Sequence, residues 1–219
     1  EDGWYKDEGN WYYYQDGQKL HGWQQIDGKW YYFSKYSGYM YRGSATIRSD
    51  NNGKYYQYAF SNSGELITNG WGSYSSYNNA GESYQTTWYY ASASGVLYAD
   101  EWKKIDGEWY YFNDYGAMVT GAQRFSDEKA DGTYEYYTYV FSKSGVWQHN
   151  AGWAASTYIS SYGYEETNWY YLNANGKAIE DQWKKIGNDW YYFDDDGSML
   201  KSGSYSFTDY DDDDNYIPV

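Results

Sequence analysis

Tryptophan and tyrosine are the residues of this chain whose type and spacing could bind a ligand. The segment Trp-Tyr-Tyr-Phe begins at Trp30, Trp109 and Trp190, and the steps between them are 79 (109 − 30) and 81 (190 − 109) residues. The face of an aromatic ring stacks on the C–H groups of a sugar or attracts a quaternary ammonium. A surface feature that repeats along one chain favours a binding protein for a repetitive ligand over an enzyme with a single active site.

The longer segments between these repeats combine aromatic rings with polar Ser, Asn and Tyr side chains. We expect their rings to form platforms for a ligand, with hydroxyl and amide groups beside them that fix its orientation. Tyr77 and Tyr162 are predicted to be exposed because they lie near polar hairpin tips, and Trp147 is also expected to be exposed. The predicted platform residues are Trp71, Tyr74, Tyr77, Trp88, Trp147, Trp153, Tyr158, Tyr162 and Trp169.

Other chemistry has little support in the sequence. The 31 carboxylates form no paired constellation, and runs such as Asp194–Asp196 are typical of solvated loops, without the ordered spacing of a Ca2+ loop. The two histidines, His21 and His149, lie in different segments without metal-ligand spacing, and we interpret both as surface residues. Cysteine is absent, which excludes disulfides and thiolate metal sites. We therefore predict a protein that is not an enzyme and has no cofactor or metal.

Charge and hydropathy exclude further classes of partner. The net charge is −15, which disfavours nucleic acid and anionic lipid, because phosphate contacts require clustered Lys and Arg. No apolar run is long enough to span a membrane. The chain begins at Glu1 without a Met or a signal peptide, and we interpret it as a mature or excised piece of a larger protein. A neutral sugar or a cationic group suits this charge best.

The elements that must carry the rings are β-hairpins. Asp-Gly pairs at Asp27-Gly28 and Asp106-Gly107 stand between two aromatic-rich runs, and such pairs favour a type I′ turn. No stretch has helical periodicity. The core must be built largely from the 55 aromatic residues (13 Trp, 35 Tyr and 7 Phe). We divide the chain into eight hairpins, at residues 4–22, 23–43, 44–70, 71–101, 102–121, 122–152, 153–182 and 183–203.

The lengths of these hairpins predict an internal duplication. Hairpins of about 20 residues alternate with pairs of longer ones, which gives a super-repeat of about 80 residues. The predicted fold is an all-β solenoid of tandem β-hairpins with two lobes formed by the longer hairpins. The predicted divisions are residues 1–43 (short hairpins), 44–121 (first lobe and a short repeat), 122–203 (second lobe and a short repeat) and 204–219 (a solvated acidic tail).

Three segments resemble the choline-binding, or cell-wall-binding, repeat: residues 22–33, residues 102–112 with 116–121, and residues 183–203. The same superfamily includes the glucan-binding repeats of glucansucrases. The resemblance implies a β-hairpin solenoid on a secreted or surface-attached protein of a Gram-positive bacterium. It also implies cages for a quaternary ammonium, in which two Trp of one repeat and a Tyr of the next enclose the ligand. The corresponding pairs are Trp23 with Trp30, Trp102 with Trp109, and Trp183 with Trp190.

These observations leave three hypotheses for function. The first is a non-catalytic module that binds a neutral polysaccharide, specifically an α-glucan such as starch or dextran, at two repeated sites. We expect this module to be extracellular and monomeric. The alternative is an anchor to a choline-bearing cell-wall polymer such as teichoic acid. The third is a spacer or adhesin scaffold that displays a protein-binding face.

Overall fold

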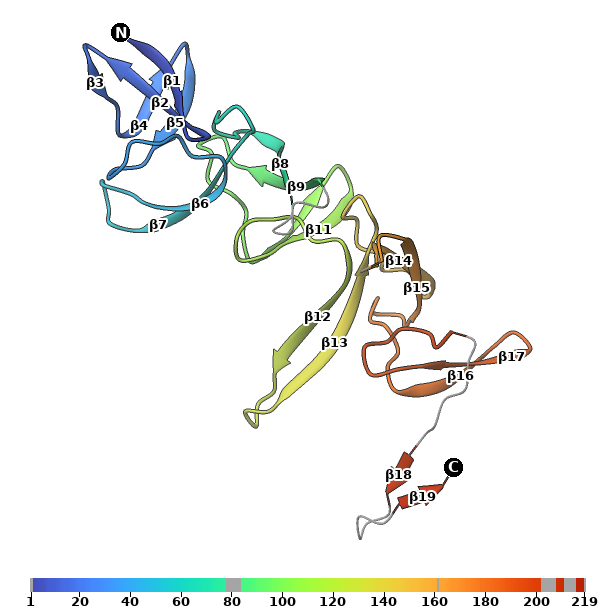
Figure 1. The fold of residues 1–219 in the computed structure, drawn as a ribbon. Helices are drawn as coiled ribbons and strands as arrows, with labels where there is room; N and C mark the ends of the chain where they lie inside the picture. Colours follow the sequence, from blue (N-terminus) through green and yellow to red (C-terminus); the bar gives the residue numbers. More distant parts are fainter. Residues whose placement is uncertain (1, 78–83, 161, 202–207, 211–215, 219) are drawn as a thin grey trace. The chain divides into compact units, whose positions relative to one another are not determined.

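Antiparallel β-hairpins make up the fold, as predicted, and no helix occurs among the residues described (Figure 1). The structure, a computed structural model, describes residues 2–77, 84–160, 162–201, 208–210 and 216–218. Each hairpin is a separate small sheet of two strands, and only the first has a third strand. Within this part of the chain, no helix is long and apolar enough to cross a membrane.

Eight hairpins follow one another in the order that the sequence predicts, and a ninth comes after them. The first four are β1 (Gly3–Asp7) with β2 (Asn10–Gln15) and the short β3 (Gln18–Lys19), β4 (Gly22–Ile26) with β5 (Lys29–Phe33), β6 (Gly43–Arg48) with β7 (Tyr55–Phe60), and β8 (Gly70–Tyr77) with β9 (Tyr84–Ala91). The next four are β10 (Glu101–Ile105) with β11 (Glu108–Phe112), β12 (Gly121–Glu128) with β13 (Tyr134–Phe141), β14 (Gly152–Ile159) with β15 (Glu165–Leu172), and β16 (Gln182–Ile186) with β17 (Asp189–Phe193). We number these pairs hairpin 1 to hairpin 8.

The short hairpins turn where the Asp-Gly pairs predict. Asp27 and Gly28 have φ angles of 51° and 80°, and Asp106 and Gly107 have 50° and 93°. Two successive positive φ angles are the mark of a type I′ turn, whose twist matches that of the flanking strands. The turn chemistry in the sequence therefore sets the register, and Trp23 pairs with Tyr32 across hairpin 2.

In hairpins 2 to 8, the residue at the end of the second strand is buried in the core of its compact unit. Phe33, Phe60, Phe112, Phe141 and Phe193 are fully buried at this position, and Ala91 and Leu172 take it in hairpins 4 and 7. Tyrosines extend this core, since Tyr31, Tyr32, Tyr89 and Tyr170 are also buried. Nine of the 21 buried hydrophobic residues among the described ones are aromatic, so the prediction of a largely aromatic core holds only in part, and Ile, Leu, Val, Met and Ala supply the rest.

The residues fall into two compact units. The first contains residues 1–121 and 141–147, and the second contains residues 122–140 and 148–219. The division of the chain into short repeats and two lobes remains a prediction. The ninth hairpin pairs β18 (Thr208–Tyr210) with β19 (Tyr216–Pro218) inside the segment that the sequence suggested was a solvated tail. Most of that tail, with Asp211 to Asp214, lies outside the described residues.

Candidate functional site

Hairpin 1 shows how a hairpin presents two indole rings on one face. Trp4 of β1 pairs with Tyr13 of β2, and Lys6 pairs with Trp11. Residues two apart on a strand point to the same face, so Trp4 and Trp11 lie on one side of the hairpin. Their ring centroids are 6.4 Å apart and their planes meet at 87°. The two rings therefore form a corner with perpendicular walls.

The next hairpin supplies the other walls of this corner. The Tyr31 ring lies 5.0 Å from Trp4 at an interplanar angle of 66°. Met40 follows hairpin 2 and donates its backbone N–H to the Trp11 carbonyl oxygen at 2.7 Å. We call a residue in the position of Met40 the closing residue. This hydrogen bond fixes the Met40 thioether beside the Trp11 ring, and the corner thereby becomes a pocket.

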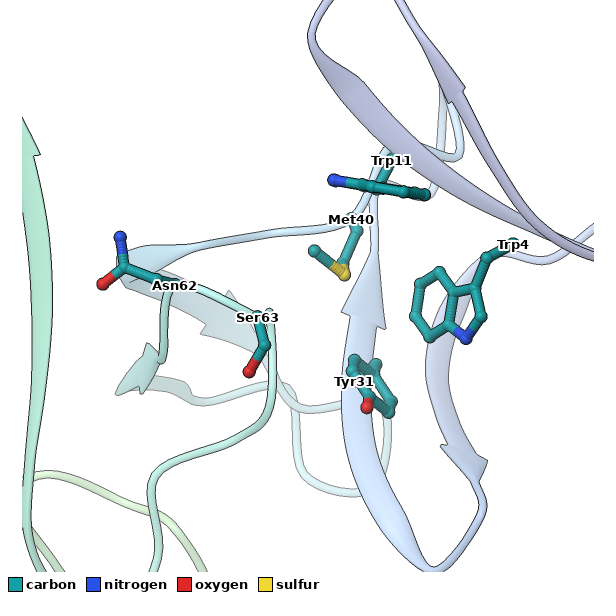
Figure 2. A pocket seen from close by; sticks show the side chains of 6 residues that line it. All are labelled: Trp4, Trp11, Tyr31, Met40, Asn62 and Ser63. Atoms are coloured by element: carbon teal, nitrogen blue, oxygen red, sulfur yellow. The ribbon is translucent and has the colours of Figure 1, made fainter.

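This pocket, which we call pocket A, has a volume of about 350 Å3 and draws on three consecutive hairpins. Figure 2 shows the indole rings and the Tyr31 ring around Met40, with Ser63 across from Trp4. The polar residues come from the turn that follows hairpin 3. The complete lining is Trp4, Trp11, Tyr31, Met40, Asn62 and Ser63.

Pocket B repeats the arrangement one hairpin further along and has a volume of about 410 Å3. Trp23 lies 4.9 Å from the Tyr58 ring at 71°, and the Leu66 N–H donates to the Trp30 carbonyl oxygen at 2.8 Å. Trp30 keeps 45% of its surface exposed, so its ring is accessible to a ligand. The complete lining is Trp23, Trp30, Tyr58, Leu66, Thr68, Ala93 and Ser94.

Two further corners share the same contacts. In hairpin 4, Trp71 lies 5.0 Å from Tyr110 at 70°, and Met118 donates its N–H to Trp88 at 2.8 Å. In the second compact unit, the corresponding residues of hairpins 7 and 8 repeat the pattern: Trp153 to Tyr191 is 5.1 Å at 82°, and Met199 to Trp169 is 2.7 Å. All four of these tryptophans retain between 37% and 45% exposure.

Trp147 is half-buried, which corrects the expectation that it is exposed. Its backbone N–H donates to the Trp109 carbonyl oxygen at 2.8 Å, which is the bond that defines a closing residue. Its ring packs 5.1 Å from Trp102. Trp147 therefore stands where Met40 stands in pocket A, and the corner of hairpin 5 is closed by a third indole.

Hairpins 3 and 6 lack the pair of tryptophans, and their corners are filled by the protein itself. In hairpin 3 the first position is Ser44, and the Leu97 N–H donates to Gln57 in place of a Trp. Tyr89 packs there at 3% exposure. Burial raises the pKa of its hydroxyl, an effect that hydrogen bonds to Ser44 and Thr87 partly offset. In the second unit, Tyr170 is buried at 3% exposure in the same core cluster as Ala178, and burial raises the pKa of its hydroxyl to about 12.

The lining of pockets A and B is mostly apolar, with a few neutral polar groups. None of the residues that line these two pockets carries a formal charge. Lys29 and Glu65, which precede Trp30 and Leu66 of pocket B in the sequence, form an ion pair at 2.5 Å, and both side chains are partly exposed to solvent. The pockets therefore offer ring faces, a thioether or aliphatic group, and hydroxyl and amide groups, without an acid or base for catalysis.

The predicted platform residues are distributed over several places. Trp71 with Trp88 and Trp153 with Trp169 lie in aromatic corners, as described above. Tyr74 is half-buried against the core cluster around Tyr89. Tyr77 and Tyr162 are exposed at 67% and 84%, in line with their predicted exposure, and Tyr158 donates its hydroxyl to Glu166 at 3.2 Å. These three tyrosines do not line pocket A or B.

The three tryptophan pairs that the family resemblance implies as cages have different surroundings in the structure. Trp23 and Trp30 line pocket B, and Trp102 and Trp109 contribute to the corner closed by Trp147. Trp183 and Trp190 lie on the same face of hairpin 8. Residues 202–207, which follow this hairpin, lie outside the described residues. The sequence reasoning missed Trp4 and Trp11, the tyrosines and closing residues of both pockets, and the polar turns. A count of one hairpin length from each Trp pair could have found Tyr31 and Tyr58.

Metal-binding groups are not gathered at these pockets. The described residues hold no cluster of three or more His, Asp or Glu side chains suited to a metal ion. In the acidic turn after hairpin 8, burial and the neighbouring Asp196 raise the pKa of Asp194. Its carboxylate accepts hydrogen bonds from the Ser198 hydroxyl and backbone N–H, both at 2.8 Å. His21 and His149 are exposed, as expected.

Comparison with known families identifies two related kinds of repeat in the chain. Residues 20–71 match the family described as the choline-binding repeat. Residues 100–118, 164–178 and 181–199 match the family described as a putative cell wall binding repeat. No curated protein sequence matches the chain.

Several solved structures are similar to this chain. Choline binding protein F from Streptococcus pneumoniae, solved in the presence of a peptidoglycan analogue, is 25% identical over 92% of this chain and 58% of that one, with a TM-score of 0.41. The modular autolysin LytC from the same organism is 24% identical over 92% of this chain and 39% of that one, with a TM-score of 0.38. An alternansucrase in complex with isomaltononaose is 22% identical over 98% of this chain and 15% of that one, with a TM-score of 0.35.

Proposed function

The chain carries repeats of the choline-binding and cell-wall-binding family, and on that premise we propose that it is a non-catalytic module that binds a neutral glycan chain. The glycan of this proposal is an α-glucan such as starch or dextran. It would lie against the indole faces of the aromatic pockets, with its hydroxyl groups turned toward the polar turns.

The observation that carries this proposal is the composition of the pocket walls. Pocket A sets two indole rings opposite Asn62 and Ser63, and pocket B sets two opposite Thr68 and Ser94. A sugar ring has an apolar face and a rim of hydroxyl groups, so it uses both kinds of wall. Volumes of about 350 and 410 Å3 lie in the usual range for sites that hold small organic ligands.

Repetition of the pockets suits a polymer. Pockets A and B come from overlapping sets of hairpins, and the corner at Trp71 lies further along the same compact unit. When one chain occupies two linked sites, the second contact forms at an effective concentration set by the spacing. Weak individual pockets would then give firm attachment to starch or dextran and weak binding of short oligosaccharides.

A second candidate is attachment to a choline-bearing cell-wall polymer. The observation that favours it is the perpendicular arrangement of the rings, with Trp4 and Trp11 at 87° and Trp153 and Trp169 at 88°. Walls at right angles present several ring faces to one quaternary ammonium, and each face attracts it by about 0.5–2 kcal/mol. The neutral polar groups of the turns would have no role in such a complex.

Isothermal titration of the full chain against maltoheptaose, isomaltoheptaose, soluble starch, dextran and choline tests these candidates. We expect heat with an α-glucan, and its loss in the double variant Trp11→Ala/Trp30→Ala. Tyr36→Ala is the matched control, because this aromatic ring is 99% exposed and lies outside both pockets. Absence of heat with every glucan at millimolar concentration, together with elution of the protein from an amine resin by choline, would establish the second candidate instead.

The module's setting forms part of the same proposal. Binding of extracellular glycans requires a secreted or surface-attached protein, and the family resemblance implies a Gram-positive bacterium. We propose a monomer, because the pockets are built within one chain. Light scattering at micromolar concentration should give the mass of one chain. A capture experiment without glycan should recover no protein partner, whereas a protein-binding scaffold would recover one.

A further inference from the structure

Three turns of the first compact unit share the sequence Ser-x-Ser-Gly, and they are not distributed at random. They follow hairpins 3, 4 and 6, at residues 61–64, 92–95 and 142–145. In each turn the two serine hydroxyls are hydrogen bonded to one another, at 2.8, 3.0 and 2.9 Å respectively. The second serine of each turn is exposed.

Each of these turns stands against the closing residue of an aromatic corner two hairpins earlier. A Cβ atom added to Gly64 would overlap the Met40 thioether of pocket A. A Cβ atom at Gly95 would lie 2.7 Å from Leu66 of pocket B. A Cβ atom at Gly145 would overlap Met118, the closing residue of the corner at Trp71 and Trp88. The glycine permits the turn to approach closely enough to form a pocket wall.

The corners without a tryptophan pair face a different kind of turn. Gly116, at Leu97 of the hairpin 3 corner, ends the sequence Asn-Asp-Tyr-Gly. Gly197, at Ala178 of the hairpin 6 corner, ends the sequence Asp-Asp-Asp-Gly. In the first compact unit, the serine pair thus accompanies three open aromatic corners and is missing from the hairpin 3 corner, which the protein fills itself. The hairpin 6 corner of the second unit, which is also filled, lacks it as well.

In two of these turns, the hydroxyl of the first serine also accepts a hydrogen bond from the backbone. The Glu65 N–H donates to the Ser61 hydroxyl oxygen at 3.2 Å, and the Val146 N–H donates to that of Ser142 at 3.1 Å. A hydroxyl that accepts from the backbone can still donate its own proton to the second serine. When the first serine donates to the second, the second serine keeps its proton for a ligand, and the pair acts as an oriented donor.

We infer that the second serines, Ser63, Ser94 and Ser144, are specificity-determining residues that donate to the hydroxyl groups of a bound sugar. This inference rests on the proposed glycan-binding function. It assigns three complete pockets to the first compact unit, the third around Trp71, Trp88, Tyr110 and Met118 with the 142–145 turn as its polar wall. A complete pocket therefore takes three consecutive hairpins, and its ligand class is a polyhydroxylated ring, since a quaternary ammonium offers no acceptor.

The test compares the triple variant Ser63→Ala/Ser94→Ala/Ser144→Ala of the full chain with Ser37→Ala. Ser37 also precedes a turn glycine, but that glycine packs against Lys19 and not against a closing residue of a pocket. Loss of one hydrogen bond per site should weaken maltoheptaose binding about fivefold, which corresponds to about 1 kcal/mol. Ser37→Ala should leave the affinity unchanged, and the binding of tetramethylammonium, a quaternary ammonium without an oxygen atom, should be the same in all three proteins.

The outcomes separate this inference from the proposed function. If the triple variant binds maltoheptaose as tightly as the parent protein while Trp11→Ala/Trp30→Ala has lost binding, the serine wall is wrong and the glycan function stands. If the binding of tetramethylammonium and of maltoheptaose weakens equally in the triple variant, the serines act through the fold and the inference is also overturned. If the parent protein binds no glucan, the proposed function fails and takes the inference with it.

Discussion

Gly95→Ala should destabilise the protein and narrow pocket B at the same time. Gly95 has a φ of 83°, where an alanine costs about 1–2 kcal/mol through its own backbone, less about 0.4–1 kcal/mol from the loss of unfolded-state freedom. Its new Cβ would lie 2.7, 3.0 and 3.2 Å from three atoms of the Leu66 side chain. Such overpacking in a closely packed site adds about 1–3 kcal/mol.

Gly28→Ala carries the backbone cost without the overpacking. Gly28 has nearly the same φ, 80°, but no heavy atom lies within 4 Å of its added Cβ. The backbone cost is therefore shared by the two variants. The difference in unfolding free energy between them, about 1–3 kcal/mol, reports the contact with Leu66 alone.

The assay is equilibrium unfolding in urea followed by tryptophan fluorescence, with glycan titration of the same samples. Gly95→Ala should unfold at a lower urea concentration than Gly28→Ala, and it should lose affinity because Leu66 must move into pocket B. Equal midpoints and equal slopes for the two variants would show that the turn does not press on Leu66. The three-hairpin construction of the pocket would then be refuted.

Three further predictions concern binding, pH and metal ions. Trp30→Ala should weaken α-glucan binding about 30-fold, the effect of a residue that contributes about 2 kcal/mol. The melting temperature of this variant should change little, since Trp30 is 45% exposed, and a large drop would contradict this prediction. Stability should fall between about pH 10 and pH 12, because burial and Asp100 raise the pKa of Tyr111 to about 12, and the Asp181 hydrogen bond and burial raise that of Tyr192 to about 12. The folded protein keeps these protons after the unfolded chain has lost them, so Tyr111→Phe/Tyr192→Phe should fall less steeply in a melting series over this range, and identical slopes would refute the assignment. EDTA should leave the melting temperature unchanged, and a decrease that Ca2+ reverses would show a metal site that the described residues do not reveal.

The hairpins could be predicted from sequence because their determinants are local. Asp27-Gly28 fixes a turn type, the turn fixes the register, and the register places Trp23 and Trp30 on one face. Each step involves residues less than ten positions apart. The same logic predicts a largely aromatic core, because few aliphatic residues are present to fill it.

The pocket walls could not be predicted in this way because they depend on how one hairpin stacks on another. Ser63 reaches pocket A from a turn two hairpins beyond Trp11, and no local pattern specifies that approach. Trp147 was expected to be exposed, but its backbone N–H donates to the Trp109 carbonyl oxygen, and this bond places it in a closing position. The ninth hairpin was missed because its acidic sequence resembles that of a solvated segment.

A crystal structure of the full chain grown with maltoheptaose would show whether these pockets bind a glycan. We expect glucose rings stacked on Trp4, Trp11 or Tyr31 in pocket A and on Trp23, Trp30 or Tyr58 in pocket B, with Ser63 and Ser94 hydrogen bonded to their hydroxyl groups. Empty pockets in that crystal, together with choline bound between the same rings when it replaces the sugar, would rule out glycan binding at these sites.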